Sequence, residues 1–318
     1  MIEQERKHPG AAGEFSWLLC GLTLASKIID AHIKRAGIVD VLGATGTTNV
    51  HGEVVQKLDV LANRAILKCL AYRGNVGILV SEEDEEPTVI KEGPEGKYIV
   101  LFDPLDGSGN IDINAPVGTI FSVLERPDEG DANTQPLQQG IRQKAAGYII
   151  YGNSTVLCYT TGDGVHMFTL DPSIGAFVLA NEHVRMGGEK IYSVNEAYYD
   201  SFPEGYRRYI NWVKNDGGYT QRYIGSLVGD FHRTLLKGGV FLYPPTGKQP
   251  GGKLRLMYEA NPMAVLAEQA GGMAIDGHGR ILEKQPSSLH ERTPLVIGGK
   301  DEVERVRKFI AQSSPDRL

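Results

Sequence analysis

Residues 102–110 combine two carboxylates with a tight, glycine-rich turn. The segment reads Phe-Asp-Pro-Leu-Asp-Gly-Ser-Gly-Asn and continues an apolar run, residues 98–102, that is typical of a buried strand. Asp103 and Asp106 offer the hard oxygen ligands that Mg²⁺ prefers, and the backbone amides of residues 107–110 are placed to approach a phosphate. This combination favours phosphoryl transfer to water. Asp, Pro and Gly also build ordinary turns, so a purely structural turn stays equally open for the segment alone.

A second acidic cluster follows another short apolar run, residues 77–81. Glu82 and Glu83 come directly after this predicted strand. Ligand crevices in open sheets lie beyond strand ends, so both glutamates are candidate ligands of the same cations. The remaining acids of the run, residues 84–86, are interpreted as a solvated turn.

A third acidic element, residues 49–59, leads into a predicted amphipathic helix. The apolar positions of that helix are Val54, Leu58, Leu61 and Ala65. Glu53 begins the helix and Asp59 lies inside it, and at about 100° per residue a spacing of six places them on different faces. At most one of the two then looks inward, unless the helix begins after Glu53. A glutamate near a helix N-terminus and an exposed aspartate are the structural alternative.

The fourth element lies near the other end of the chain, in residues 251–263. It carries Glu259 in the pattern Lys-x-Arg-x-x-Tyr-Glu-x-x-Pro. Four acidic elements in this order, with this strand and turn and this last segment, resemble class I fructose-1,6-bisphosphatase, of the metal-dependent, lithium-sensitive sugar and inositol phosphatase superfamily. The resemblance runs from about Gly13 to Phe309, nearly the whole chain, and its motifs taken together are specific.

The resemblance implies a catalytic metal site with two or more Mg²⁺ ions per subunit and Mn²⁺ as a substitute. The implied metal ligands are Glu82, Glu83, Asp103, the Leu105 carbonyl, Asp106, Glu259 and Glu53. Glu53 stands where many members have Asp, which keeps the charge and lengthens the arm. The implied catalytic residues are Asp59, Glu83 and Glu82, and the first two help to activate the attacking water.

The substrate implied by the resemblance is D-fructose 1,6-bisphosphate. The phosphate to be removed is expected against Asp106, Gly107, Ser108, Gly109 and Asn110. The residues matched to the sugar and its remaining phosphate are Asn195, Tyr198, Arg222, Tyr223, Tyr243 and Lys253. Arg255 is a further candidate for substrate binding. In the family, the arginine at Arg222 reaches into the neighbouring subunit's site, which implies a homotetramer. Without the resemblance, the three tyrosines would be interpreted as core or surface residues.

The charge balance of the chain agrees with a need for cations. There are 33 Lys and Arg against 39 Asp and Glu, a formal net charge of −6, and bare carboxylates would repel a substrate with two dianionic phosphates. Divalent cations reverse the local field, bind phosphate oxygens and lower the pKa of bound water. Mg²⁺ is favoured over Zn²⁺ because the ligands are oxygen atoms and no His or Cys spacing suggests zinc.

Length and composition, 318 residues with 41% hydrophobic and 23% charged, allow one or two large cores. Helices are predicted at residues 15–36, after Glu53, and at 204–215, 226–237, 262–270 and 302–312. The clearest predicted strands are 98–102, 119–124, 145–151, 155–160 and 165–170. This order agrees with the α/β (α+β) class and the layered α-β-α-β-α sugar phosphatase fold that the resemblance implies. A boundary at 187/188 separates a metal-binding and candidate regulatory half, 1–187, from a sugar-phosphate-binding half, 188–318.

Several partners are not expected. The sequence has no basic patch for nucleic acid and no membrane span. Residues 17–25 resemble a short signal core, but their apolar rhythm continues into a polar-backed helix without a cleavage signal, so a folded helix is expected. Cys20, Cys69 and Cys158 are widely spaced in apolar elements and are expected as buried, reduced thiols of a cytoplasmic protein.

The AMP site of the family has a partial match in this chain. The matching positions are Gly13, Glu14 and Ser16 at a helix start, with Lys97 and Tyr98. Ala12 and Ser16 replace threonines of well-known members, and an arginine expected nearby falls on Glu125, with Arg126 one place later. A carboxylate there would repel AMP, so we expect weakened or altered AMP inhibition.

Three functions compete on the sequence alone. The leading one is Mg²⁺-dependent conversion of D-fructose 1,6-bisphosphate to D-fructose 6-phosphate and phosphate, as in gluconeogenesis. Sedoheptulose-1,7-bisphosphatase shares the turn and metals, and Asn195, Tyr223, Tyr243 and Lys253 together favour the fructose substrate. A non-catalytic sugar-phosphate sensor is the third, although loss of an acidic residue such as Asp103 would be expected for it.

Overall fold

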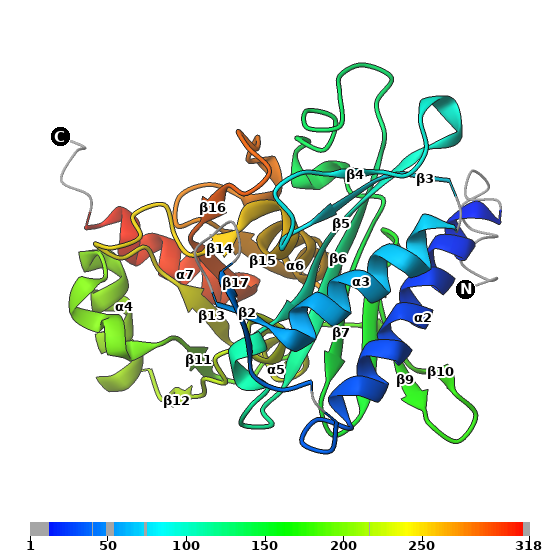
Figure 1. Ribbon diagram of the computed structural model, residues 1–318. Helices are drawn as coiled ribbons and strands as arrows, with labels where there is room; N and C mark the ends of the chain where they lie inside the picture. The colour runs from blue at the N-terminus through cyan, green and yellow to red at the C-terminus, as the bar shows by residue number, and fades with distance from the viewer. Residues whose placement is uncertain (1–12, 40, 49–53, 73–74, 216, 314–318) are drawn as a thin grey trace.

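The chain folds into alternating layers of helices and sheets. The computed structural model describes residues 13–39, 41–48, 54–72, 75–215 and 217–313. Figure 1 shows one outer helix pair, α2 (Glu14–Ile33) and α3 (Lys57–Ala71), at the opposite end from the other, α4 (Glu204–Asn215) and α7 (Lys300–Ala311). Two sheets and a central helix pair lie between them. The predicted layered α-β-α-β-α fold is confirmed.

The larger sheet has eight strands. Their bounds are β3 Val76–Ser81, β4 Thr88–Val89, β5 Tyr98–Asp106, β6 Val117–Glu125, β7 Ala145–Tyr151, β8 Thr155–Thr160, β9 Val165–Asp171 and β10 Ala176–Val184. In the sheet they follow the order β10-β9-β8-β7-β6-β5-β3-β4. All neighbours are antiparallel except β3 and β5, which run parallel. Only β3 and β5 therefore end, side by side, at the same edge of the sheet.

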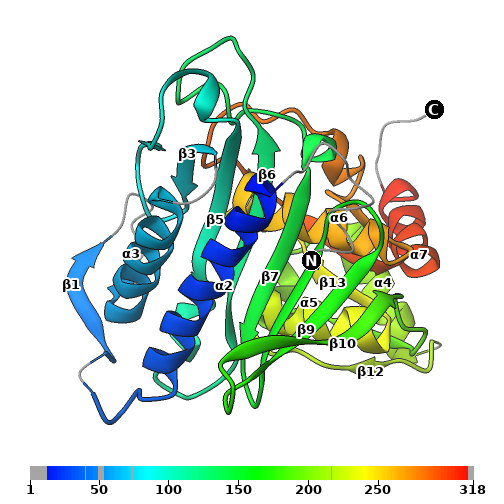
Figure 2. The same ribbon diagram turned by 90° about the vertical axis from the view of Figure 1, so that its right-hand side faces the viewer.

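Helices α2 and α3 cover one face of this sheet, as Figure 2 shows. Leu18, Leu22, Ala25 and Ile29 recur at helical spacing along α2, and all are buried against the sheet. A two-stranded ribbon, β1 (Ala44–Thr48) with β2 (Val54–Gln56), joins the two helices.

The smaller sheet has five strands in the order β12-β11-β13-β17-β15. Their bounds are β11 Ile191–Ser193, β12 Thr220–Gln221, β13 Val240–Tyr243, β15 Gly272–Ile275 and β17 Leu295–Gly299. A separate pair, β14 (Leu254–Arg255) and β16 (Arg292–Thr293), leads into a short π-helix, Leu256–Ala260. Helices α4 and α7 cover the outer face of the sheet through Tyr209 and Val306, among others.

The central layer consists of α5 (Leu227–Lys237) and α6 (Asn261–Gln269), which lie between the two sheets. A single hydrophobic core joins Tyr148 of the larger sheet, Phe231 of α5, Met263 of α6 and Phe241 of the smaller sheet. The two sheets therefore share one packed interior, and the start of α5 and the π-helix before α6 both approach the end of β5.

Most predicted elements are confirmed within one to four residues, and β7, β8 and α4 have the predicted bounds. The predicted helix start near Glu53 is wrong. Residues 54–56 form β2 and α3 begins only at Lys57, while Glu53 itself lies outside the described residues. Strand β10 was not predicted, although residues 176–180 are apolar, and most of the strand is exposed. The boundary at 187/188 stays a prediction.

Two further expectations concern membranes and thiols. Within the described segments, no helix combines the length and apolar character that a membrane crossing requires. No disulfide joins the three cysteines, all of which are in described segments. Cys69 and Cys158 are buried as expected, whereas Cys20 is only partly buried, because it lies at the edge of the buried face of α2.

Candidate active site

The acidic residues of the first two sequence clusters meet where β3 and β5 end. The strands are parallel neighbours, with Ser81 opposite Phe102. Glu82 and Glu83 therefore follow β3 at the level where β5 reaches Asp103. Both glutamates line the same cavity as Asp103 and Asp106. The four carboxylates lie together at one edge of the sheet, as expected.

An irregularity in β5 sets the directions of its two aspartates. Asp103 lies opposite Ile120 of β6, whereas Asp106 lies opposite Gly118, so β5 carries one extra residue between them. In a regular strand, residues three apart point to opposite faces. This β-bulge brings the carboxylates of Asp103 and Asp106 to the same face.

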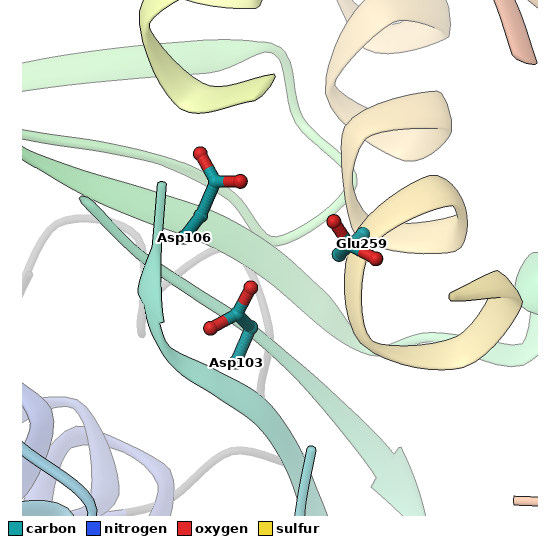
Figure 3. A group of neighbouring side chains, drawn as sticks. All are labelled: Asp103, Asp106 and Glu259. Atoms are coloured by element: carbon teal, nitrogen blue, oxygen red, sulfur yellow. The ribbon is translucent and has the colours of Figure 1, made fainter. Parts of the chain in front are cut away.

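Glu259 completes the cluster from the C-terminal part of the chain. It lies in the π-helix before α6, and one carboxylate oxygen from each of Asp103, Asp106 and Glu259 falls within 4.8 Å of the other two. Figure 3 shows the three side chains converging from the strand and the helix. The backbone N–H of Arg255 donates to Glu259 Oε2 at 2.5 Å, and Arg255 Nε lies 3.1 Å from Glu82 Oε1. One arginine thus contacts two members of the acidic site.

Burial and mutual repulsion perturb these acids. Burial, followed by the charges of Glu82 and Asp106, raises the pKa of Asp103 well above its ordinary value. Burial and the Asp106 carboxylate raise the pKa of Glu259 from 4.5 to about 8. Burial also raises the pKa of Asp106, although hydrogen bonds from Val228 and Ser226 act in the opposite direction. A positive charge bound among these carboxylates would therefore be stabilised.

The N-terminus of α5 holds Asp106 in place. Ser226 Oγ and the Val228 backbone N–H each donate to Asp106 Oδ2 at 2.8 Å. Both donors belong to the first turn of the helix, where free N–H groups and the helix dipole favour an anion. Gly107 follows with φ of +76°, and a Cβ there would lie 2.9 Å from the Ser226 Cβ. A glycine is therefore required where the backbone of the turn at residues 107–110 meets α5.

Two adjoining cavities surround these elements. The first, about 300 Å³, holds the acidic residues and the turn at 107–110. The second, about 620 Å³, lies over the end of β13 and includes Asn195, Tyr198 and Lys248. Tyr223, Gly225, Tyr243 and Lys253 line both cavities. One elongated site therefore has an acidic end that suits cations and a second end with amide, phenol and ammonium donors that suits an anion.

Comparison with known proteins agrees with this arrangement. Residues 1–182 match the family model described as fructose-1-6-bisphosphatase, N-terminal domain, and residues 186–311 match the corresponding C-terminal domain. This chain belongs to the fructose-1,6-bisphosphatase family. The metal-dependent phosphatase identity suggested by the sequence resemblance is thereby confirmed.

Relatives of this fructose-1,6-bisphosphatase family member match nearly its full length. A class 1 fructose-1,6-bisphosphatase of Chloroherpeton thalassium is 50% identical over 318 residues, covering 97% of this chain and 91% of the relative. One from Salinibacter ruber is 51% identical over 332 residues, covering 100% and 91%. Leishmania major fructose-1,6-bisphosphatase in holo form superposes with a TM-score of 0.90 at 42% identity, covering 94% of both chains.

Most residues predicted for the site of this fructose-1,6-bisphosphatase lie together. Those lining the first cavity are Glu82, Glu83, Asp103, Leu105, Asp106, Gly107, Ser108, Gly109, Asn110, Tyr223, Tyr243, Lys253, Arg255 and Glu259. Asn195 and Tyr198 line the second cavity. Arg222 lines neither; it is exposed, and its guanidinium donates to the Gln221 carbonyl at 2.8 Å. Its predicted role depends on a neighbouring subunit.

Asp59 is not among the residues that line the two cavities. Because α3 begins at Lys57, Asp59 falls in the first turn, where its carboxylate accepts a hydrogen bond from the Gln56 N–H at 2.9 Å as part of a capping box. One turn later on the same helix, Asn63 Nδ2 donates to Asp84 Oδ1 at 3.0 Å. This bond ties the Asp59 face of α3 to the segment that carries Glu82 and Glu83.

The predicted effector positions surround the start of α2. Gly13 precedes the helix with φ of +66°, and Phe15 in its first turn packs edge-on against Tyr98 at 5.7 Å between ring centroids. Ser16 is partly buried, and Lys97 precedes Tyr98 at the start of β5. The start of α2 therefore lies beside Tyr98 of β5, which the sequence resemblance also matches to the AMP site of the family.

Sequence reasoning missed Asp230, which organises the loop between the two cavities. Its fully buried carboxylate accepts hydrogen bonds from Ser193 Oγ at 2.7 Å and from the N–H groups of Ile224 and Gly225 at 3.1 and 2.9 Å. It also pairs with Arg233 at 3.1 Å. An aspartate among the apolar positions of a predicted helix was the available signal, because buried charges are rarely left without partners.

The donor set fits a hard divalent cation. Every side chain of the close cluster is a carboxylate, and burial of several such groups together is unfavourable unless protons or cations neutralise them. The raised pKa values of Asp103 and Glu259 reflect how unfavourable it is to bury these groups in the charged form. The residues that could hold a metal are therefore Asp103, Asp106 and Glu259, with Glu82 and Glu83 beside them.

In chelator, we expect the free energy of unfolding to decrease as pH rises. The folded Glu259 has a pKa of about 8 against 4.5 ordinarily, so its contribution is complete below about 4.5 and is lost as pH rises through about 8. The variant Glu259→Gln should show a flatter profile. Urea unfolding in EDTA from about pH 5 to about pH 9 measures this.

Glu92→Gln, at an exposed glutamate, is the matched control and should keep the wild-type slope. Added divalent cation should remove most of the loss in the wild type at high pH. Equal slopes for Glu259→Gln and the wild type would show that Glu259 does not carry the effect.

Proposed function

We propose that this protein hydrolyses D-fructose 1,6-bisphosphate to D-fructose 6-phosphate and phosphate. The observation that carries the proposal is the pair of adjoining cavities with a common wall of Tyr223, Gly225, Tyr243 and Lys253. A sugar lying across this wall presents one phosphate to the acidic cluster and the other to the second cavity. Names of relatives at about 50% identity over nearly the whole chain support the same activity.

Mg²⁺ is the proposed metal, with Mn²⁺ as a substitute and two or more ions per subunit. Asp103, Asp106, Glu259, Glu82 and Glu83 would hold it, with the Leu105 carbonyl; Glu53 rests on the sequence resemblance alone. When bound, such ions polarise phosphoryl oxygens, lower the pKa of a water and stabilise the leaving oxygen.

The chain's own residues position the reacting phosphate. Ser108 and Gly109 offer backbone N–H groups and one hydroxyl at the cavity wall, and Asn110 N donates to the Gly107 carbonyl at 2.8 Å, which keeps the turn tight. We assign removal of the water proton to Glu83 and Asp59, with Glu82 beside them. The Asn63–Asp84 bond supports this assignment by holding α3 against the acidic segment.

The remaining phosphate is assigned to the second cavity. Asn195, Tyr198 and Tyr243 supply amide and phenol groups, and Lys253 supplies an ammonium group between the two ends. Arg255, whose backbone and guanidinium contact the acidic site, would assist at the phosphate that leaves. No bond breaks at the second phosphate, so fixed donors are sufficient there.

Neither alternative function is favoured by the relatives, which carry fructose-1,6-bisphosphatase names. We place the protein in the cytoplasm, in gluconeogenesis, as a homotetramer. We also retain 1–187 and 188–318 as its two functional halves, close to the change from one family model to the other at residues 182–186.

The proposal is tested by phosphate release from fructose 1,6-bisphosphate, with sedoheptulose 1,7-bisphosphate and a hexose monophosphate beside it. We expect preference for the fructose bisphosphate and complete loss of turnover in chelator. Asp103→Asn should lower kcat at least about 100-fold, because it removes a charge from the cluster. Asp112→Asn, at an exposed aspartate near the turn, should retain wild-type activity.

Preference for the sedoheptulose bisphosphate would mean that the second cavity was misassigned. Retained turnover in Asp103→Asn would contradict the metal assignment. Binding of sugar bisphosphate without any hydrolysis would favour the sensor function.

AMP inhibition is expected to be weak. Glu125 lies opposite Tyr98 on β6 and pairs with Lys144 at 3.0 Å, and Arg126 is held by the Lys91 carbonyl and Gln135 at 2.8 Å each. The Glu125 side chain is an anion, and the Arg126 guanidinium already donates to other groups. Neither side chain therefore offers a cationic contact to a phosphate at the start of α2. An AMP titration of phosphate release measures this, and Glu125→Arg should increase the inhibition. Inhibition of the wild type in the submicromolar-to-micromolar range would refute the expectation.

Arg222 is expected to act in a neighbouring subunit. Arg222→Ala and Asp103→Asn subunits should each be strongly impaired as pure oligomers. Random co-assembly should restore about a quarter of the wild-type activity, since half of the paired subunits are mixed and each mixed pair has one complete site. Phosphate release by purified mixed oligomers measures the recovery. No recovery, in oligomers shown to be mixed, would place Arg222 outside the neighbouring site.

A further inference from the structure

The bulge in β5 is joined to β6 by a side-chain hydrogen bond. Pro104 and Leu105 together face Thr119 of β6, because Asp103 pairs with Ile120 and Asp106 with Gly118. Pro104 has no N–H, so the ladder cannot close on this residue in the usual way. The Thr119 hydroxyl donates to the Pro104 carbonyl at 2.8 Å, in a fully buried contact.

A second buried hydroxyl orients the first. Tyr151 OH lies 3.0 Å from Thr119 Oγ1. A threonine hydroxyl has one proton, and the Pro104 carbonyl can only accept, so Thr119 spends its proton there. Tyr151 must therefore be the donor to Thr119. The two bonds form one chain, directed from Tyr151 through Thr119 to the Pro104 carbonyl.

The Tyr151 end of this hydrogen-bond chain lies on the side of the sheet that α2 covers. Thr155 is the cross-strand partner of Tyr151, and its hydroxyl donates to the Asp30 carboxylate of α2. Burial raises the pKa of Tyr151, and the Asp30 charge raises it further. Tyr151 therefore keeps its proton and remains a donor throughout the range in which the enzyme would work.

We propose that Thr119 and Tyr151 are positioning residues that set the metal affinity of the acidic cluster by fixing the bulge between Asp103 and Asp106. Neither side chain lines either of the two cavities of the site, and both lie on the α2 face of the sheet, opposite the carboxylates. They act through the backbone, because Pro104 lies in the strand segment between Asp103 and Asp106, the residues that would hold the ion. The inference rests on the proposed metal-dependent function.

A purely structural role is the alternative, since any buried hydroxyl pair stabilises a sheet. The two roles differ in what a conservative change does. Loss of a structural bond lowers the unfolding midpoint only, whereas loss of a positioning bond also changes the affinity of the carboxylates for a cation. Outer-shell groups of metal sites typically alter metal affinity 10–100-fold.

The experiment measures Mn²⁺ binding by electron paramagnetic resonance, which needs no turnover. Thr119→Val keeps the side-chain shape and removes the hydroxyl, Tyr151→Phe removes the second hydroxyl, and Thr119→Ser retains the first. Thr160→Val is the matched control, because Thr160 is equally buried on β8 and its hydroxyl accepts from Gly162 N at 3.0 Å, away from the turn.

We expect Thr119→Val to weaken Mn²⁺ binding about tenfold or more, with a smaller loss for Tyr151→Phe. The double variant should bind about as weakly as Thr119→Val, because the Tyr151 bond acts through Thr119. Thr119→Ser and Thr160→Val should bind as the wild type does, and Mg²⁺ activation of phosphate release should follow the same order.

Wild-type Mn²⁺ affinity in Thr119→Val, with only a lowered unfolding midpoint, would overturn the proposal. If Thr119→Val does not fold, Tyr151→Phe decides in the same way. If the wild type binds Mn²⁺ but does not release phosphate from fructose 1,6-bisphosphate, the proposed function fails while the binding series still tests the positioning role. If the wild type binds no Mn²⁺, the positioning role fails directly.

Discussion

Carboxylates crowded together away from water are the constraint on which the rest of the site depends. Asp103, Asp106 and Glu259 approach within 4.8 Å, with Glu82 and Glu83 beside them. Such a group is unfavourable unless neighbouring donors or cations offset the repulsion. The surrounding elements supply donors in different ways: the start of α5 donates two hydrogen bonds to Asp106, and Arg255 lies against Glu82.

The same contacts explain why both sheets are needed. Asp103 and Asp106 belong to the larger sheet, whereas Glu259 and the α5 donors belong to elements packed between the sheets. The common hydrophobic core fixes the distance between these groups. Asp230 then holds the loop that lies between the two cavities, which fixes the second cavity relative to the acidic cluster.

The family resemblance predicted the layers, and the sequence pattern predicted most helices and strands. Of the 20 residues that line the first cavity, 14 were named from the sequence. These predictions succeeded because apolar runs mark β3 and β5, and because acidic residues follow both runs directly. The sequence did not predict the bulge that turns Asp103 and Asp106 to one face, since register depends on the pairing with β6. The start of α3 was also missed, because residues 54–56 pair with β1 in a ribbon, and this pairing is a tertiary contact rather than a local propensity. Asp230 escaped notice because no sequence pattern shows that its carboxylate is buried and binds the 224–225 backbone and Ser193.

The division of the cluster between the larger sheet and the elements packed between the two sheets has a consequence for folding. A partly folded chain with only the larger sheet in place would carry Asp103 and Asp106 without Glu259 and without the α5 donors. Such an intermediate would offer a divalent cation an incomplete set of ligands. Binding of a divalent cation would therefore favour the completed fold over such an intermediate by mass action.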